Sequence, residues 1–220
     1  MPLHSKPIAL VALLPLALAA CSQKGEFNAS AAGLGVNVVR SPCPAVGVPN
    51  YTGDITLFNP PASRAAAAID VTATITNIRT TCEDDKVSAE LVSTSTFDVQ
   101  ARRADTRGAR TVPLTYFSTV VRGGDAVVSK RLGQVVIHFA DGEARGSASG
   151  SASAVVNRAA ASLPENIRER LTRKRKASDQ DASIDPLAEP EVRKAVATAT
   201  FEVLIGFQLN PDQFQYNVTR

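Results

Sequence analysis

The sequence predicts an antiparallel β-sandwich with one inserted α-helix. Three observations favour this all-β fold class. Apolar and polar residues alternate through most of the chain after residue 50, short turn signals separate the alternating runs, and only one segment has a helical texture. The pattern of alternating strands and long helices that is typical of a parallel sheet is missing. We therefore expect a single sandwich domain over residues 42–220, with a helical insertion at about 159–194.

The first half of this domain contains three predicted strands. Residues 54–58 follow a glycine and stop at an Asn-Pro-Pro sequence, which cannot continue a strand. In residues 69–76, Ile, Val and Ala alternate with Asp and Thr, the pattern of a half-buried strand. A polar turn is expected at residues 82–85. Residues 89–101 then alternate again, with Leu91 and Phe97 on the apolar side.

The next segments are expected to be strands joined by tight turns. Residues 114–122 and 126–139 flank a Gly-Gly-Asp turn signal, and the second of them reads as one long strand or two broken ones. Asp141-Gly142 predicts a further hairpin. It leads into residues 143–157, whose Ala, Ser and Gly side chains are small for a strand in the core.

The last predicted strand has the strongest pattern. Seven apolar residues share one parity over thirteen positions, from Ala197 to Leu209. We place this strand centrally in a sheet, and we expect Asn210-Pro211-Asp212 to end it.

The helical insertion is predicted from a capping box, Ser162-Leu163-Pro164-Glu165, with proline in the first turn. Leu163, Ile167 and Leu171 form a narrow apolar stripe. The rest of the helix is basic and could bind lipid phosphates, anionic envelope polymers or an acidic partner. The candidate residues for this anionic-partner site are Arg168, Arg170, Arg173, Lys174, Arg175 and Lys176.

The basic helix also has an alternative interpretation. Residues 163–191 contain six basic and seven acidic side chains, so the segment is nearly neutral as a whole. The helix would then be a solvated scaffold whose cations suit its dipole and whose acidic neighbour folds back onto it.

The first 20 residues have the features of an export signal. A short region with one cation, Lys6, precedes an apolar run that is too short to be a permanent membrane helix and that has small residues near its end. The sequence Leu18-Ala19-Ala20-Cys21 then resembles the lipobox of bacterial lipoproteins. This resemblance implies cleavage before Cys21, acylation of the cysteine (palmitate included) and anchoring in a membrane by the lipid.

Residues 21–41 are rich in Gly, Ala, Ser and Asn and are expected to be a flexible tether. Ser22 follows the lipobox cysteine. In lipoproteins of this kind, aspartate at that position tends to retain the protein in the inner membrane. Serine therefore implies the outer membrane, with the domain facing the periplasm.

Two cysteines remain once Cys21 carries the lipid. An exported domain folds in an oxidising compartment, so we expect a disulfide between Cys43 and Cys82. It would close a loop of about 40 residues and stabilise the fold by roughly 4 kcal/mol. The alternative is two separate buried thiols. No His or further Cys stands at metal-ligand spacing near them, so no metal site is expected.

Composition disfavours several function classes. The 24 Lys and Arg nearly balance the 21 Asp and Glu, and together with the export signal this argues against binding of nucleic acid. Tryptophan is absent and aromatics make up 5%, which disfavours a deep aromatic platform for carbohydrate. After the signal only His138 remains, on a predicted strand, and no hydrolase, metalloprotease or phosphate-loop motif occurs. We expect neither an enzyme nor a cofactor.

The mature part resembles a group of uncharacterised lipoproteins from alphaproteobacteria in the segments 43–46 (CPAV), 70–77 (DVTATITN), 168–176 (RERLTRKRK) and 206–209 (GFQL). This resemblance implies no activity and no catalytic residues. The alternating strand that ends at Asn77 also resembles a strand of immunoglobulin-like modules, which implies an immunoglobulin-like general layout.

The sequence thus predicts a lipid-anchored envelope protein that is a non-catalytic protein-binding or assembly module. The alternative is a lipid or envelope-glycan binding module that uses the basic helix. A long bare sheet edge would favour the protein partner, and a large apolar cavity would favour the lipid. Carboxylates or His138 in a deep cleft would favour an enzyme. The pattern does not determine the oligomeric state.

Overall fold

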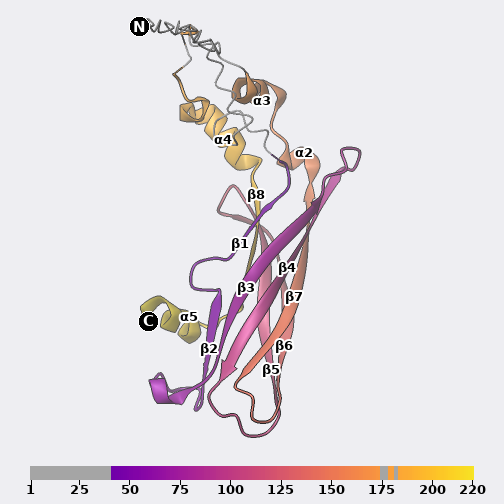
Figure 1. Ribbon diagram of the computed structural model, residues 1–220. Coiled ribbons are helices and arrows are strands. Elements are labelled where there is room, and N and C mark those ends of the chain that lie inside the picture. Colours follow the sequence, from indigo (N-terminus) through magenta and orange to yellow (C-terminus); the bar gives the residue numbers. More distant parts are fainter. Residues whose placement is uncertain (1–40, 174–177, 181–182) are drawn as a thin grey trace, which may run out of the picture.

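The computed structural model describes residues 41–173, 178–180 and 183–220. Its strands are β1 (Ala45–Gly47), β2 (Asp54–Phe58), β3 (Ile69–Glu83), β4 (Glu90–Arg103), β5 (Arg110–Arg122), β6 (Ala126–Phe139), β7 (Arg145–Asn157) and β8 (Phe201–Phe207). They form two four-stranded sheets packed face to face (Figure 1). Sheet A has the order β1-β8-β5-β6, and sheet B has the order β2-β3-β4-β7. The predicted all-β sandwich is confirmed.

Neighbouring strands are antiparallel except β1 and β8, which are parallel. The β3–β4 hairpin lies within sheet B and the β5–β6 hairpin within sheet A. Gly123 and Gly124, with φ of 68° and 89°, make the predicted tight turn of the β5–β6 hairpin. The Asp141-Gly142 turn does not make the hairpin we predicted, because it carries the chain from β6 in sheet A to β7 in sheet B.

The core lies between the two sheets and is formed by the inward-facing residues of the strands. In β4 the buried residues include Leu91, Phe97, Val99 and Ala101, as the alternation predicts. Phe97 meets Tyr116 of sheet A edge-to-face, with ring centroids 5.0 Å apart.

Two glycines on neighbouring strands make room for this aromatic pair. A Cβ at Gly133 of β6 would lie 2.4 Å from Tyr116, and one at Gly150 of β7 would lie 2.4 Å from Phe97. The small residues on the inner face of β7 therefore leave room for large rings from neighbouring strands.

The four α-helices among the described residues are α2 (Arg158–Ala161), α3 (Glu165–Thr172), α4 (Pro190–Thr198) and α5 (Pro211–Thr219); the short 3₁₀ turns are η1 (Ala66–Ala68) and η2 (Pro186–Ala188). In Figure 1, α2, α3 and α4 gather beyond one end of the sandwich, and α5 lies beside β2. No described helix is long and apolar enough to cross a membrane.

The predicted helix of the insertion is present as α3, but its start and end differ from the prediction. Pro164 occupies the N-cap without a side-chain hydrogen bond. The Ser162 hydroxyl instead donates to the carbonyl oxygen of Arg158 at 2.8 Å, at the end of α2, so the predicted capping box is wrong. The helix ends at Thr172, and Lys174, Arg175 and Lys176 lie outside the described residues.

The long strand predicted from Ala197 to Leu209 is also partly wrong. Only Phe201–Phe207 is a strand, while Ala197 lies in α4. Pro190 at the first position and Glu191 in the first turn begin that helix, and alanine suits a helix as readily as an alternating pattern. Asn210-Pro211-Asp212 ends β8, as predicted, and at the same time begins α5.

The predicted turn at residues 82–85 begins later than expected. Cys82 and Glu83 still belong to β3, where they pair with Ser93 and Val92 of β4. The connecting loop starts at Asp84, and its turn residues are Lys86 and Val87.

Candidate functional site

The most distinctive surface of the sandwich is the outer edge of β7. This thirteen-residue strand is the last one in sheet B, and its only ladder partner is β4. An edge strand presents backbone N–H and C=O groups that no neighbour uses.

The hydrogen bonds at the two ends of the β4–β7 ladder determine which residues of β7 point their N–H and C=O groups outward. Arg103 N donates to Ala144 O, and Arg158 N donates to Ala89 O, each at 2.9 Å. Hydrogen-bonded pairs alternate along an antiparallel ladder, so the even-numbered residues of β7 bond to β4. The odd-numbered ones point outward. In agreement with this parity, the Tyr116 hydroxyl donates to the carbonyl oxygen of Ser151 at 2.6 Å.

The side chains of β7 leave this edge uncovered. The odd positions carry exposed serines from Ser147 to Ser153 and then Val155, which is 51% exposed. The even positions carry Gly, Ala and one Val, which face the core. No charged residue occurs from Gly146 to Asn157. After Arg145 the strand is thus long and uncharged, which are the properties that favour pairing with another strand.

The other three edges of the two sheets have features that discourage pairing. β1 has only three residues. β2 has five, it is followed by two prolines, and the carbonyl oxygen of Asp54 on its outer edge accepts a hydrogen bond from Asn217 of α5 at 2.8 Å. β6 carries Lys130 and Arg131, and its ladder with β5 has an irregularity at Val120/Val121. Of the four edges described, β7 alone is long and has no proline, no mid-strand charge and no ladder irregularity, and its one capped carbonyl is that of Ser151, which accepts from Tyr116.

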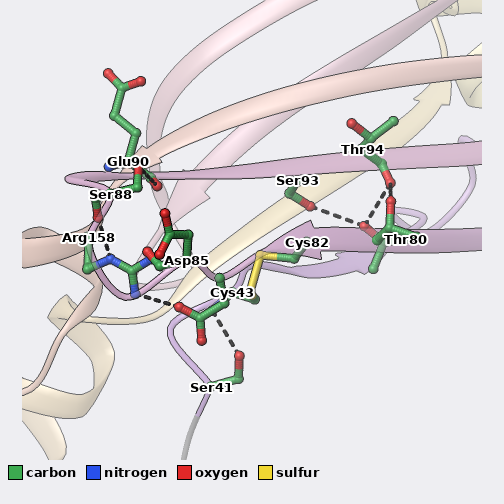
Figure 2. The surroundings of a disulfide bond; sticks show 12 residues. Ser41, Cys43, Thr80, Cys82, Asp85, Ser88, Glu90, Ser93, Thr94 and Arg158 are labelled. Carbon is green, nitrogen blue, oxygen red and sulfur yellow. Dashed lines mark hydrogen bonds and ion pairs between the residues drawn. A yellow bond between two sulfur atoms is a disulfide. The ribbon is translucent and has the colours of Figure 1, made fainter.

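The predicted disulfide is confirmed. Cys43 and Cys82 are bonded, with Cα atoms 6.1 Å apart, and the bridge ties the chain before β1 to the end of β3 (Figure 2). Beside it, the Arg158 guanidinium donates to the Asp84 carboxylate and to the carbonyl oxygens of Ser88 and Asp85. The bridge and Arg158 together fix the β3–β4 hairpin at the helical end of β7.

The basic residues predicted to bind an anionic partner are partly neutralised within the chain. Arg168 forms an ion pair with Glu165, three residues earlier on α3. Arg170 forms ion pairs with Glu189 and, at 3.2 Å, with Glu191. The acidic segment thus folds back onto α3, as the alternative interpretation of the helix expected. Arg173 is exposed at the end of α3.

Cys21, the predicted site of lipidation, lies outside the described residues. His138 is exposed on the outer face of β6, where its Nδ1 lies 3.2 Å from the Thr111 hydroxyl. No group of three or more metal-ligating side chains occurs among the described residues.

A surface hollow of about 380 Å³ lies at the helical end. Alanines from α2 and α4 form much of its wall, and Arg122, Glu191 and Lys194 also line it. A second hollow of about 290 Å³ lies between sheet A and α5, with Phe117, Phe214 and Lys130 in its wall. Both are open to solvent, and His138 lines neither of them.

The chain was compared with protein-family models, with curated proteins and with solved structures, and none of them matches it.

Proposed function

We propose that this protein is a lipid-anchored, non-catalytic module of the cell envelope that binds a partner protein by strand addition at β7. The observation that carries the proposal is the unprotected β7 edge. Its outward N–H and C=O groups give an extended segment the same hydrogen bonds that a further strand of the sheet would make. The exposed serines and the small core-facing residues of β7 leave room for that segment.

The helical end supports this choice over an anionic lipid or glycan ligand. Arg168 and Arg170 already contact carboxylates, so an anion would have to displace Glu165, Glu189 or Glu191. Exposed ion pairs contribute little stability, but they neutralise the charge that the ligand would need. Among the described residues, the partner therefore has a better binding surface on β7 than on α3.

The membrane address is part of the proposal. Acylation of Cys21 would hold the protein at the outer membrane, with the sandwich in the periplasm. We expect Cys21→Ala to move the protein from the membrane fraction to the soluble periplasmic fraction, because one acyl-bearing residue supplies the whole anchor. Fractionation of intact cells measures this, with Ser22→Ala as the matched control. A Cys21→Ala protein that stays with the membrane although its first 20 residues have been removed would contradict the anchor.

The role of β7 is tested by Ser153→Pro. The N–H of Ser153 faces outward, so proline can stand there without removing a bond to β4, but a partner strand loses its hydrogen-bond donor and meets the ring. We expect capture of the partner by crosslinking in intact cells to fall about tenfold or more, because at least one buried hydrogen bond is lost.

The control is Ser153→Ala. This variant also loses the contact between the Ser153 and Thr94 hydroxyls, 3.2 Å apart, but it keeps the backbone N–H. Equal capture of the same partner by both variants would show that β7 is not the binding edge. Loss of the partner in an Arg168→Gln/Arg170→Gln variant, with Ser153→Pro unaffected, would transfer the interface to α3.

A further inference from the structure

The β7 edge has a second property, which concerns the identity of the bound strand. We propose that this strand is β7 of a second copy of the chain, paired antiparallel about a two-fold axis at Gly150. The inference rests on the proposed function, since it takes the β7 edge as the binding surface. It adds that the module assembles with itself.

The order of residues along β7 carries this inference. Residues 147–153 read Ser-Ala-Ser-Gly-Ser-Ala-Ser, which is the same sequence in both directions about Gly150. A two-fold interface requires a surface that is complementary to itself. Pairing centred on Gly150 places serine opposite serine, alanine opposite alanine and glycine opposite glycine.

The backbone parity agrees with the same register. Pairing about Gly150 joins odd-numbered residues to odd-numbered ones, so Ser149 of one copy faces Ser151 of the other, and Ser147 faces Ser153. These are the residues whose N–H and C=O groups point outward. The carbonyl oxygen of Ser151 already accepts from Tyr116, but a carbonyl has a second lone pair for the new N–H.

Charge also favours a second copy at β7. Like charges placed opposite each other across a strand pair are destabilising, and pairing about a two-fold axis brings charges close to the axis near their own duplicates. From Gly146 to Asn157 there is no charge to repel. Self-pairing of β6 about an axis at Lys130 or Arg131 would bring these cations close to the same cations of the other copy.

The product would be one continuous eight-stranded sheet, made of sheet B from both copies. Its outer face would extend the existing rows of hydroxyl side chains, in which Thr94 of β4 lies beside Ser153 of β7. The membrane anchor would favour this weak contact, because tethering to one surface raises the effective concentration of the copies.

The two sandwiches point in opposite directions in this dimer. The helical end of each sandwich holds Cys43, the first cysteine after the predicted tether. In the dimer these two ends would lie at opposite ends of the paired strands, which are about 40 Å long. A chain of the length of residues 21–41 reaches at most about 70 Å, so both anchors can enter one membrane if β7 lies parallel to it.

The test is disulfide crosslinking of the full-length protein with the double variant Ser147→Cys/Ser153→Cys. Within one chain these positions are six residues apart, or about 20 Å, and cannot bond to each other. In the proposed dimer each faces the other position of the second copy at about 5.5 Å between Cα atoms, within disulfide range. We expect mild oxidation of intact cells to give a dimer on non-reducing gels.

The single variants and the parent protein serve as matched controls. Ser147→Cys alone and Ser153→Cys alone would each place their two thiols about 20 Å apart in the dimer, so neither should crosslink. The parent protein reports any dimer that forms through its native cysteines. Crosslinking by a single variant as efficient as that of the double variant would overturn the Gly150 axis.

Failure of this inference can be distinguished from failure of the proposed function. If the double variant gives no dimer, while Ser153→Pro still abolishes capture of a different protein, then β7 is a binding edge but not for a second copy. If neither the double variant crosslinks nor Ser153→Pro changes any capture, both proposals are wrong. Unchanged mobility of the Cys43–Cys82 bridged form shows that the variants remain folded.

Discussion

At the end of the sandwich away from α2, α3 and α4, Arg103 is 1% exposed, yet no carboxylate of the described residues is hydrogen-bonded to it. Its guanidinium donates to the carbonyl oxygens of Thr106, Gly108, Ala140 and Glu143 at 2.7–2.8 Å. These carbonyls belong to the two segments that cross between the sheets there. A planar group with five donors can bond both segments at once, which lysine cannot do. Arg103 thus fixes the loops that join β4 to β5 and β6 to β7.

Near the same end, Asp70 and Arg110 form a two-pronged ion pair, with oxygen–nitrogen distances of 2.6 and 2.7 Å. The hydrogen bonds from Arg110 hold the pKa of the Asp70 carboxyl below its usual value, although partial burial opposes them. A carboxyl whose pKa is lower in the folded state stabilises the fold above the unfolded pKa of about 3.9. That contribution disappears as the pH falls through the lowered value.

We therefore predict that Asp70→Asn lowers the free energy of unfolding by about 1 kcal/mol at pH 7, discounted for the partial exposure of Arg110. The difference in unfolding free energy between the variant and the parent should shrink as the pH falls below about 4, because protonation then makes the parent carboxyl neutral, like the Asn side chain. Urea unfolding between pH 2 and pH 7 measures this. A difference that stays constant over that range would show that the ion pair does not cause it.

At the scale of elements, the sequence predicted strands best where one face is apolar and the other polar. β4 shows this, although Ser93, Ser95 and Arg103 are buried at positions that hydropathy alone would expose. The alternating pattern wrongly predicted a strand where alanine dominated, since Ala197 fits helix α4 as well as a strand. A signal for α5 was present, because Asn210, Pro211 and Gln213 form a capping box with proline at the first position.

The candidate site was harder to predict than the fold. The sequence shows that β7 has few large side chains, but a lack of large side chains does not by itself place a strand at a sheet edge. That placement depends on pairing between β4 and β7, which are separated in the chain by a hairpin of the other sheet. The basic helix attracted attention instead, because the fold-back of Glu189 onto Arg170 depends on tertiary structure.

At the scale of the whole molecule, the two sheets are held together by different means at their two ends. Arg103 joins the crossing segments at one end. At the helical end, the bond between Cys43 and Cys82 connects the segment leading into β1 of sheet A to β3 of sheet B. On the side formed by β6 and β7, the described residues contain no disulfide between the sheets. The open edge thus lies on the side of the sandwich that is free to receive another strand.

The disulfide is therefore predicted to stabilise the whole sandwich and not only its first strand. The bonded cysteines are 39 residues apart, and the loop includes strands of both sheets. Closing a loop of that length stabilises by about 4 kcal/mol on the chain-entropy model. We expect Cys43→Ser/Cys82→Ser to lower the free energy of unfolding by up to this amount, with Thr81→Ser as a control on the same strand.

Hydrogen exchange distinguishes a global role of the disulfide from a local one, because a global effect lowers amide protection in β4 and β5 as well as β1. If protection falls only in β1, whose pairing with β8 is three residues long, the bridge acts as a local clamp and the whole-molecule role is wrong.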